Sequence, residues 1–370
     1  MPRKKRLHFK DLDALRFFAF LPVFAYCFVK HMSFDQEGLL FDVANLTGYL
    51  AINSLDFFFC LSAFLLTSHG LREYKYRESF SLKNYLIRRI FKITLLLIIL
   101  LLFIFLGHPW LIKILKLQPI VVPSVSPFMA FVPNYLSRLN NEQHIYLVVT
   151  WSIYMFLQYY LIWGIVLKFF KAQLLKISIV LICVGVAARI VHVAMDSDWQ
   201  FDTLCYGVPI GIGAIFGLMV RQEYSIIDRI KQFAKKLHAA IYTIGFIILF
   251  GAYLVSGKGY LDAFVPLGTS VFFGYIFIEQ TSAKNSLFKC RNSRISSHIG
   301  KISYGMTVYQ SIMSVLVLIA MGALDFDLSS DFLKFLSLVI SFVLTWIVAD
   351  VSFNLFERPL LVLRKEFKKT

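Results

Sequence analysis

The first long apolar segment of the chain, LDALRFFAFLPVFAYC, contains two residues that could do chemistry, Arg16 and Cys27. A charge inside a bilayer costs at least about 2.5 to 3.5 kcal/mol on insertion scales, so Arg16 is expected to have a function or a partner. On a helix, Cys27 returns to nearly the same face about 16 Å further along. His31 follows one turn later, where an imidazole could activate the Cys27 thiol as a nucleophile. The alternatives are that Arg16 is an interfacial anchor, Cys27 an ordinary small apolar residue, and His31 a marker of the end of the span.

A second pair of capable residues, Arg189 and His192, lies three positions apart and therefore on one predicted helix face. Carboxylates that could reach them from other spans are Asp56, Asp202 and Asp350. When a cation and a carboxylate on two spans come together, they usually form a buried ion pair that fixes the packing of the two helices. The functional alternative is a proton-transfer group.

The framework that positions these residues is predicted to be a membrane bundle. Of the 370 residues, 58% are hydrophobic and 16% aromatic, well above a soluble globular domain. Because one span needs about 20 mostly apolar residues, the pattern predicts an all-α integral membrane protein with about ten transmembrane helices. The predicted spans are 14–32, 49–69, 86–107, 146–167, 177–195, 203–220, 238–256, 262–279, 303–322 and 334–353. A shorter apolar piece from Pro127 to Val132, within 118–145, is expected to be re-entrant or interfacial.

Charge in the loops predicts the orientation. Most lysines and arginines fall in one alternate set of loops, and the other set has only Lys113, Lys116, Arg138 and Lys258. The basic set should face the cytoplasm, which places both termini there, in a multi-pass protein of the inner membrane. The start, MPRKKR, is not followed by a small-residue cleavage site and is expected to remain uncleaved. We expect one domain, 1–370, with a basic cytoplasmic segment 1–13 and a short cytoplasmic tail 354–370.

The sequence disfavours nucleic-acid binding, a disulfide framework and a metal site. The net charge of +16 is spread over the cytoplasmic loops without a nucleic-acid-binding motif, so the bilayer and its anionic lipids are the expected partner. Five cysteines without paired spacing argue against a disulfide framework and against a metal site. Four of them lie in predicted spans: Cys27, Cys60, Cys183 and Cys205.

Several blocks, in their order along the chain, resemble the membrane acyltransferase family 3, ten-helix proteins that move acyl groups from acyl-CoA to cell-envelope sugars and related acceptors. The resemblance covers nearly the whole chain. The blocks are LDALRFFAFLPVF from Leu12, DFFFCLSAFLLT from Asp56, YLIRRIFKI from Tyr85, TWSIYMFLQYYL from Thr150, DTLCYG from Asp202, ISYGMTVYQ from Ile302 and SFNLFERPL from Ser352.

The positions where the resemblance implies catalysis hold other residues. The family's histidine after the first-helix arginine is Cys27 here, and the histidine that usually ends the ninth-span block is Gln310. Carboxylates expected in the fourth span are replaced by Phe156 and Leu157. Transfer to a hydroxyl needs a base, so the intact catalytic set is missing and His31 is the candidate substitute.

The resemblance also implies a donor site. Arg16 would lie on the acyl-donor path, and Arg88, Arg89 and Lys92 could receive the phosphates of acyl-CoA. Their alternative role is the ordinary positive flank of a span.

These observations favour a catalytically inactive member of the family, a pseudoenzyme that acts as a subunit or scaffold of an inner-membrane assembly or binds lipid or envelope glycan. Phe156 would then plug the former catalytic cavity. An active O-acyltransferase that uses Arg16, His31 and His192 is the alternative. A transporter of a lipid-linked glycan is a weaker third hypothesis.

Overall fold

The computed structural model describes residues 10–31, 39–115, 125–135, 150–255, 259–326 and 330–359, and this part of the chain is all-α. Ten of its helices are long and apolar enough to cross a membrane, which confirms the predicted number of spans. The helices are α1 (Lys10–Val29), α2 (Leu39–Arg77), α3 (Leu82–Leu102), α4 (His108–Leu115), α5 (Ser126–Met129), α7 (Thr150–Phe169), α8 (Leu174–Ala194), α9 (Gly207–Arg221), α10 (Ser225–Gln232), α11 (Lys235–Gly251), α12 (Val265–Ser282), α13 (Arg294–Ala323) and α14 (Asp331–Ser352).

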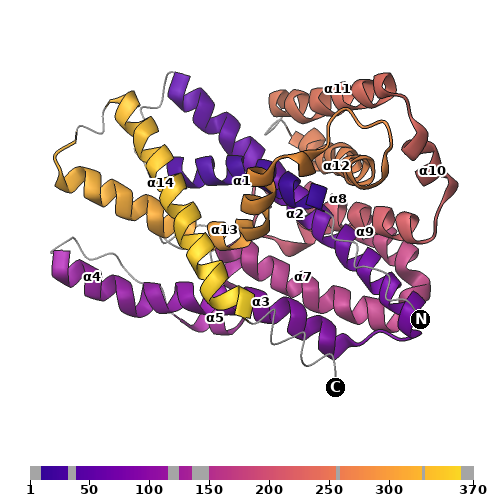
Figure 1. Cartoon of the computed structure of the whole chain (residues 1–370), viewed down its shortest axis with the longest axis horizontal. Coiled ribbons are helices and arrows are strands. Elements are labelled where there is room, and N and C mark those ends of the chain that lie inside the picture. The colour runs from indigo at the N-terminus through magenta and orange to yellow at the C-terminus, as the bar shows by residue number, and fades with distance from the viewer. Residues whose placement is uncertain are drawn as a thin grey trace.

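Several helices extend beyond the predicted spans. Helix α2 has 39 residues, about 58 Å at 1.5 Å per residue, whereas the hydrocarbon core is about 30 Å thick. Helix α3 continues through a π-helical turn (Phe103–Gly107) into α4, so that the two run in line along one edge of the molecule (Figure 1). Hydropathy finds the apolar part of such helices, and their polar ends continue because backbone hydrogen bonding does not stop at the interface.

Helix starts follow from local chemistry. The Ser81 side chain accepts a hydrogen bond from the backbone N–H of Asn84 (3.3 Å) and begins α3. The Ser293 side chain does the same for Ser296 (3.3 Å) and begins α13. Such caps satisfy an N–H group that has no partner within the helix, and both helices carry cations of the site described below.

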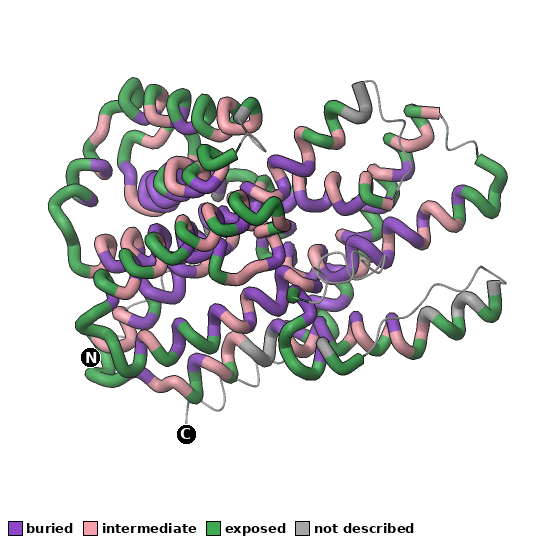
Figure 2. Tube along the Cα trace, turned by 180° about the vertical axis from the view of Figure 1, so that it is seen from behind, coloured by how far each residue is buried: buried purple, intermediate pink, exposed green. Residues whose placement is uncertain are grey.

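The middle of the bundle is formed by α2, α7 and α9, and the outer helices α8, α11 and α14 bury fewer of their residues (Figure 2). Helix α2 packs most extensively on α9, and α1 on α13. At both contacts a glycine lets backbones approach. A Cβ on Gly213 would collide with the Cys60 carbonyl oxygen, and one on Gly300 with that of Asp13. Small residues at crossings are the usual means of close packing between membrane helices.

The segment between α4 and α7 is partly described and contains no spanning helix in that part. It has the four-residue helix α5 at the expected interfacial piece. Asn134 is buried and donates to the Phe201 carbonyl oxygen (3.0 Å) and to Thr203 (3.4 Å). Gln158 of α7 donates to Asn134 (3.1 Å) and accepts from Thr203 (2.5 Å). This polar network attaches the segment to the start of α9.

Candidate functional site

A cavity of about 230 Å³ lies between α1, α2, α3, α7 and α13. Its wall combines cations, hydroxyl groups and apolar side chains. The lining residues are Arg16, Val23, Leu55, Phe58, Ser62, Leu65, Arg88, Arg89, Ile93, Ser152, Ile153, Phe156, Tyr160, Gly300, Lys301, Ser303, Tyr304 and Thr307. Three of the four cations predicted from the sequence, which come from two different helices, therefore meet at one cavity.

Two of these cations are held by carboxylates on the helices that surround the cavity. Arg16 pairs with Asp13 one turn earlier (2.5 Å), and Arg88 pairs with Glu73 of α2 (3.1 Å). The side chain of Lys92 lies outside the described part of the chain.

Arg89 differs from its neighbours. Within the described residues no carboxylate pairs with it, and its guanidinium lies 5.9 Å from the centre of the Tyr160 ring. It is close enough to Arg16 for the two charges to repel each other. Lys301, which the sequence analysis did not single out, adds another cation, whose ammonium is 4.7 Å from the Phe353 ring centre. Its position two residues before the Ser303-Tyr304-Gly305 block was the available signal. This end of the cavity has the charge of an anion-binding site.

Phe156 forms part of the cavity wall, at a position where the resemblance implies a carboxylate. Its ring stacks on that of Phe59, with centroids 4.0 Å apart and planes within 13°. The wall near it is largely apolar and aromatic, and the hydroxyl groups of Ser62 and Tyr160 are 3.2 Å apart. Leu157 faces away from the cavity into the hydrophobic core. Neither side chain can exchange a proton.

Cys27 and Gln310 meet in the bundle interior. Gln310 donates from Nε2 to the Cys27 sulfur (3.3 Å), and both side chains are buried. They lie about one turn beyond Val23 and Thr307, which line the cavity. The Oε1 atom of Gln310 is buried without a hydrogen-bond partner in the described residues. The two positions where the resemblance implies histidines thus face each other across α1 and α13, but they hold a thiol and an amide.

His31 lies just after α1, and its Nε2 atom is buried with no hydrogen-bond partner among the described residues. Burial lowers the pKa of His31 to about 4, so the imidazole is neutral at pH 7. The described residues show no hydrogen bond from it to Cys27. An activated thiol is therefore not formed in this structure.

The predicted partners of Arg189 and His192 are found on the other side of the bundle. Arg189 pairs with Asp56 (3.3 Å), donates to the Cys205 carbonyl oxygen (3.0 Å) and stacks over Trp199 (3.8 Å). These contacts join α8 to α2, as expected for a buried pair. Asp350, the third carboxylate considered, is instead 2.9 Å from His298.

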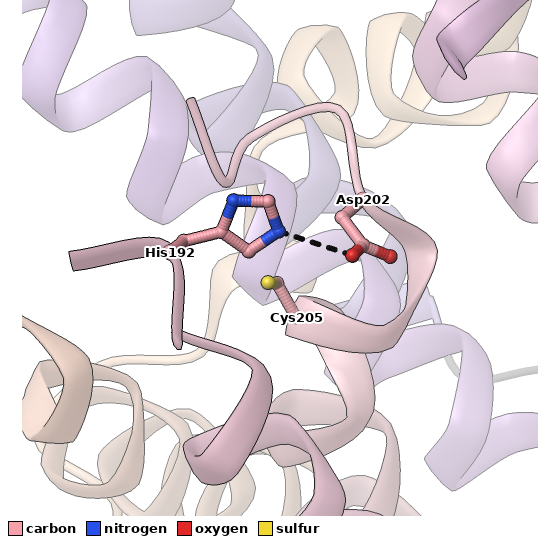
Figure 3. Close-up of side chains that lie close together, drawn as sticks. All are labelled: His192, Asp202 and Cys205. Carbon is pink, nitrogen blue, oxygen red and sulfur yellow. Dashed lines mark hydrogen bonds and ion pairs between the residues drawn. The ribbon is translucent and has the colours of Figure 1, made fainter. Parts of the chain in front are cut away.

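His192 pairs with Asp202 (3.1 Å), and the Cys205 sulfur lies beside them (Figure 3). The ligand atoms of these three residues all lie within 4.8 Å of one another. The cysteine count gave no reason to expect this group. The available signal was the spacing of Asp202 and Cys205, which share one short 3-10 turn (Thr203–Tyr206) and its cap.

Comparisons with known proteins agree with the motif resemblance. A family model of the acyltransferase 3 type, described as an acyltransferase domain, matches residues 9–352. No curated protein and no solved structure matches the chain.

Proposed function

This chain belongs to the acyltransferase 3 family, and we propose that it is a catalytically inactive member that binds acyl-CoA, or an anionic lipid of similar form, in the cavity between α1, α2, α3, α7 and α13. It would act as a binding subunit or scaffold of an inner-membrane assembly. Two features support this proposal: the cations at the cavity wall, and the residues that occupy the family's catalytic positions.

The cationic end supports anion binding. Arg16 and Arg89 lie close together and are both partly buried, and Arg89 has no carboxylate partner among the described residues. Guanidinium groups bind phosphate oxygens in pairs and with defined geometry. The cavity, at about 230 Å³, is smaller than a typical site for a drug-sized ligand, about 300 to 1,000 Å³. It would therefore take the acyl and thioester end of the ligand, and the nucleotide would lie outside against the arginines.

The positions at which the resemblance implies catalytic groups provide the argument against catalysis. Acyl transfer to a hydroxyl needs a general base within about 3 Å of the acceptor oxygen. The main observation is the contact between Gln310 and Cys27 (3.3 Å). These two residues stand at both positions where the resemblance implies histidines, and neither side chain takes up a proton at neutral pH. Phe156, stacked on Phe59, occupies a carboxylate position.

The test compares binding and turnover in the purified full chain in lipid nanodiscs. We expect a long-chain acyl-CoA to bind, and Arg89→Ala to weaken its binding at least tenfold, since each lost charged hydrogen bond is worth about 1.5 to 3 kcal/mol. Arg229→Ala, on the exposed face of α10, is the matched control and should bind like the natural protein. Mass spectrometry should detect no release of free CoA, with or without envelope extract as acceptor.

A combined variant tests the second half of the proposal. Cys27→His, Phe156→Glu and Gln310→His together restore the groups that the resemblance implies. A gain of CoA release by this variant, absent from the natural protein, supports loss of the base as the cause of inactivity. Turnover by the natural protein contradicts the proposal outright.

One observation favours a second candidate function, an O-acyltransferase that moves an acyl group from acyl-CoA to a cell-envelope glycan with relocated groups. The neutral imidazole of His31, with Nε2 buried and without a described partner, could accept a proton from an acceptor hydroxyl. This candidate requires turnover that His31→Ala abolishes while acyl-CoA binding is unchanged.

A further inference from the structure

Three donor atoms of different chemistry converge where α8 ends and the 3-10 turn before α9 begins. They are the Nε2 atom of His192, the Oδ2 atom of Asp202 and the sulfur of Cys205, all within 4.8 Å of one another (Figure 3). His192 and Cys205 are buried, and Asp202 is partly exposed. The group is separate from the cavity described above, and none of its residues lines it.

The neighbouring hydrogen bonds orient these donors toward a common point. The other ring nitrogen of His192, Nδ1, is 2.8 Å from the Ser197 hydroxyl, which in turn donates to the His192 carbonyl oxygen (3.5 Å). In the tautomer in which the Ser197 oxygen accepts the Nδ1 proton, the Nε2 lone pair faces Asp202 and is able to bind a metal ion. Metal-bound histidines are typically held by such a bond from the second nitrogen.

The carboxylate of Asp202 is oriented in the same way. Its Oδ1 atom accepts the backbone N–H of Leu204 (2.9 Å), which directs Oδ2 toward Nε2 of His192, 3.1 Å away. A proton on Nε2 makes this contact an ordinary hydrogen bond, and in the other tautomer a metal ion between Nε2 and Oδ2 would take the place of that proton.

The donor set matches a borderline-soft divalent metal. Nitrogen, carboxylate oxygen and thiolate sulfur are the ligands of Zn²⁺, and their bond lengths place tetrahedral donor atoms about 3.3 to 3.7 Å apart. The pair His192–Asp202 is close to this spacing, and Cys205 would move inward by up to about 1 Å. Two anionic ligands would cancel the charge of the ion in a buried place. The nearby Arg189 is already neutralised by Asp56 (3.3 Å).

We propose that His192, Asp202 and Cys205 bind one divalent transition-metal ion, with zinc as the best chemical match and a fourth position left for water or a ligand. On binding, the Cys205 thiol loses its proton to the solvent and its sulfur forms the bond to the metal. The site would tie the end of α8 to the start of α9.

Cobalt(II) tests the site, because a thiolate bound to it absorbs in the near ultraviolet and the visible bands report tetrahedral geometry. The full chain, purified in detergent after treatment with a chelator, is titrated with Co²⁺ and then with Zn²⁺. We expect one Co²⁺ per chain, a thiolate absorption band, and displacement of the band by Zn²⁺.

Variants identify the ligands. Cys205→Ser should remove the thiolate band, and His192→Gln should alter the visible bands and weaken binding. Ser197→Ala, which leaves all three donors, should weaken Co²⁺ binding about 10- to 100-fold. Cys183→Ser, an exposed cysteine on α8, is the matched control and should change nothing.

Absence of the band from the natural protein overturns the proposal without recourse to any variant. Persistence of the band in Cys205→Ser overturns it as well. If Cys205→Ser does not fold, Ser197→Ala decides, because unchanged Co²⁺ affinity in that variant contradicts the orientation of His192 on which the site rests.

Discussion

Removing one partner of the buried pair Arg189–Asp56 should destabilise the bundle far more than removing one partner of an exposed pair. Asp56→Asn keeps the shape of the side chain but leaves the Arg189 guanidinium without its counter-charge, 3% exposed and 3.3 Å from the new amide. Breaking a buried pair in this way costs about 3 to 5 kcal/mol, because the remaining charge stays desolvated.

A double variant separates the charge effect from the other contacts of Arg189. In Arg189→Met with Asp56→Asn neither charge of this pair remains, and the other losses are the hydrogen bond to the Cys205 carbonyl oxygen (3.0 Å) and the cation–π contact with Trp199 (3.8 Å). An unpaired buried acceptor costs about 1 to 3 kcal/mol. The double variant should therefore be more stable than the sum of the singles predicts, with a coupling energy of about 2 to 3 kcal/mol.

The assay is unfolding of the purified protein in mixed micelles by added sodium dodecyl sulfate, followed by circular dichroism. The control is Asp228→Asn, which breaks the exposed pair with Lys231, whose atoms are closer together at 2.7 Å. An exposed pair contributes at most about 1 kcal/mol, so the control should change the unfolding free energy little despite the shorter distance. Equal effects of Asp228→Asn and Asp56→Asn, or a purely additive double variant, would refute the reasoning from burial.

Three further predictions use the same unfolding assay. Gly300→Ala should cost about 1 to 3 kcal/mol because its Cβ collides with the Asp13 carbonyl oxygen, whereas Gly305→Ala, with 3.5 Å to the nearest atom, should be tolerated; equal costs contradict the packing. Burial lowers the pKa of His31 to about 4, so the unfolded chain binds more protons between pH 6.5 and 4 and stability should fall as pH falls through that window. His31→Gln should remove this dependence, and an unchanged pH profile contradicts it. Trp163→Phe removes a buried hydrogen bond to a threonine of α2 (3.0 Å) and should cost about 1 kcal/mol, with no effect on acyl-CoA binding.

The spans could be predicted because their signal is local. Twenty consecutive apolar residues are sufficient to identify a crossing segment, and each predicted span overlaps a helix of the structure. The ends were less predictable, since α2 continues to Arg77 through residues that are polar and still helical. Where a helix stops depends on capping and on contacts with other helices, which hydropathy does not measure.

Which residues belong to the site could be predicted from the sequence better than which residues contact one another. The resemblance identified Arg16, Arg88 and Arg89, and the structure places them at one cavity. The meeting of Cys27 with Gln310 depends on how α1 crosses α13, which residue types alone do not specify. Cys205 was overlooked for the same reason, because its relation to His192 is set by the turn between α8 and α9 rather than by cysteine spacing.

The distribution of charge around the cavity is itself an argument about function. Four cations lie at its wall, Arg16, Arg88, Arg89 and Lys301, while the described residues pair only two of them, with Asp13 and Glu73. Three of these cations, Arg16, Arg88 and Arg89, are partly buried, and placing like charges together there costs free energy that apolar side chains would avoid. A bound anion lowers that cost, whereas the pair Cys27–Gln310, about one turn beyond the lining residues Val23 and Thr307, is neutral. The cavity thus has the charge to hold an anionic ligand, while the nearby positions at which the resemblance implies a base hold uncharged groups.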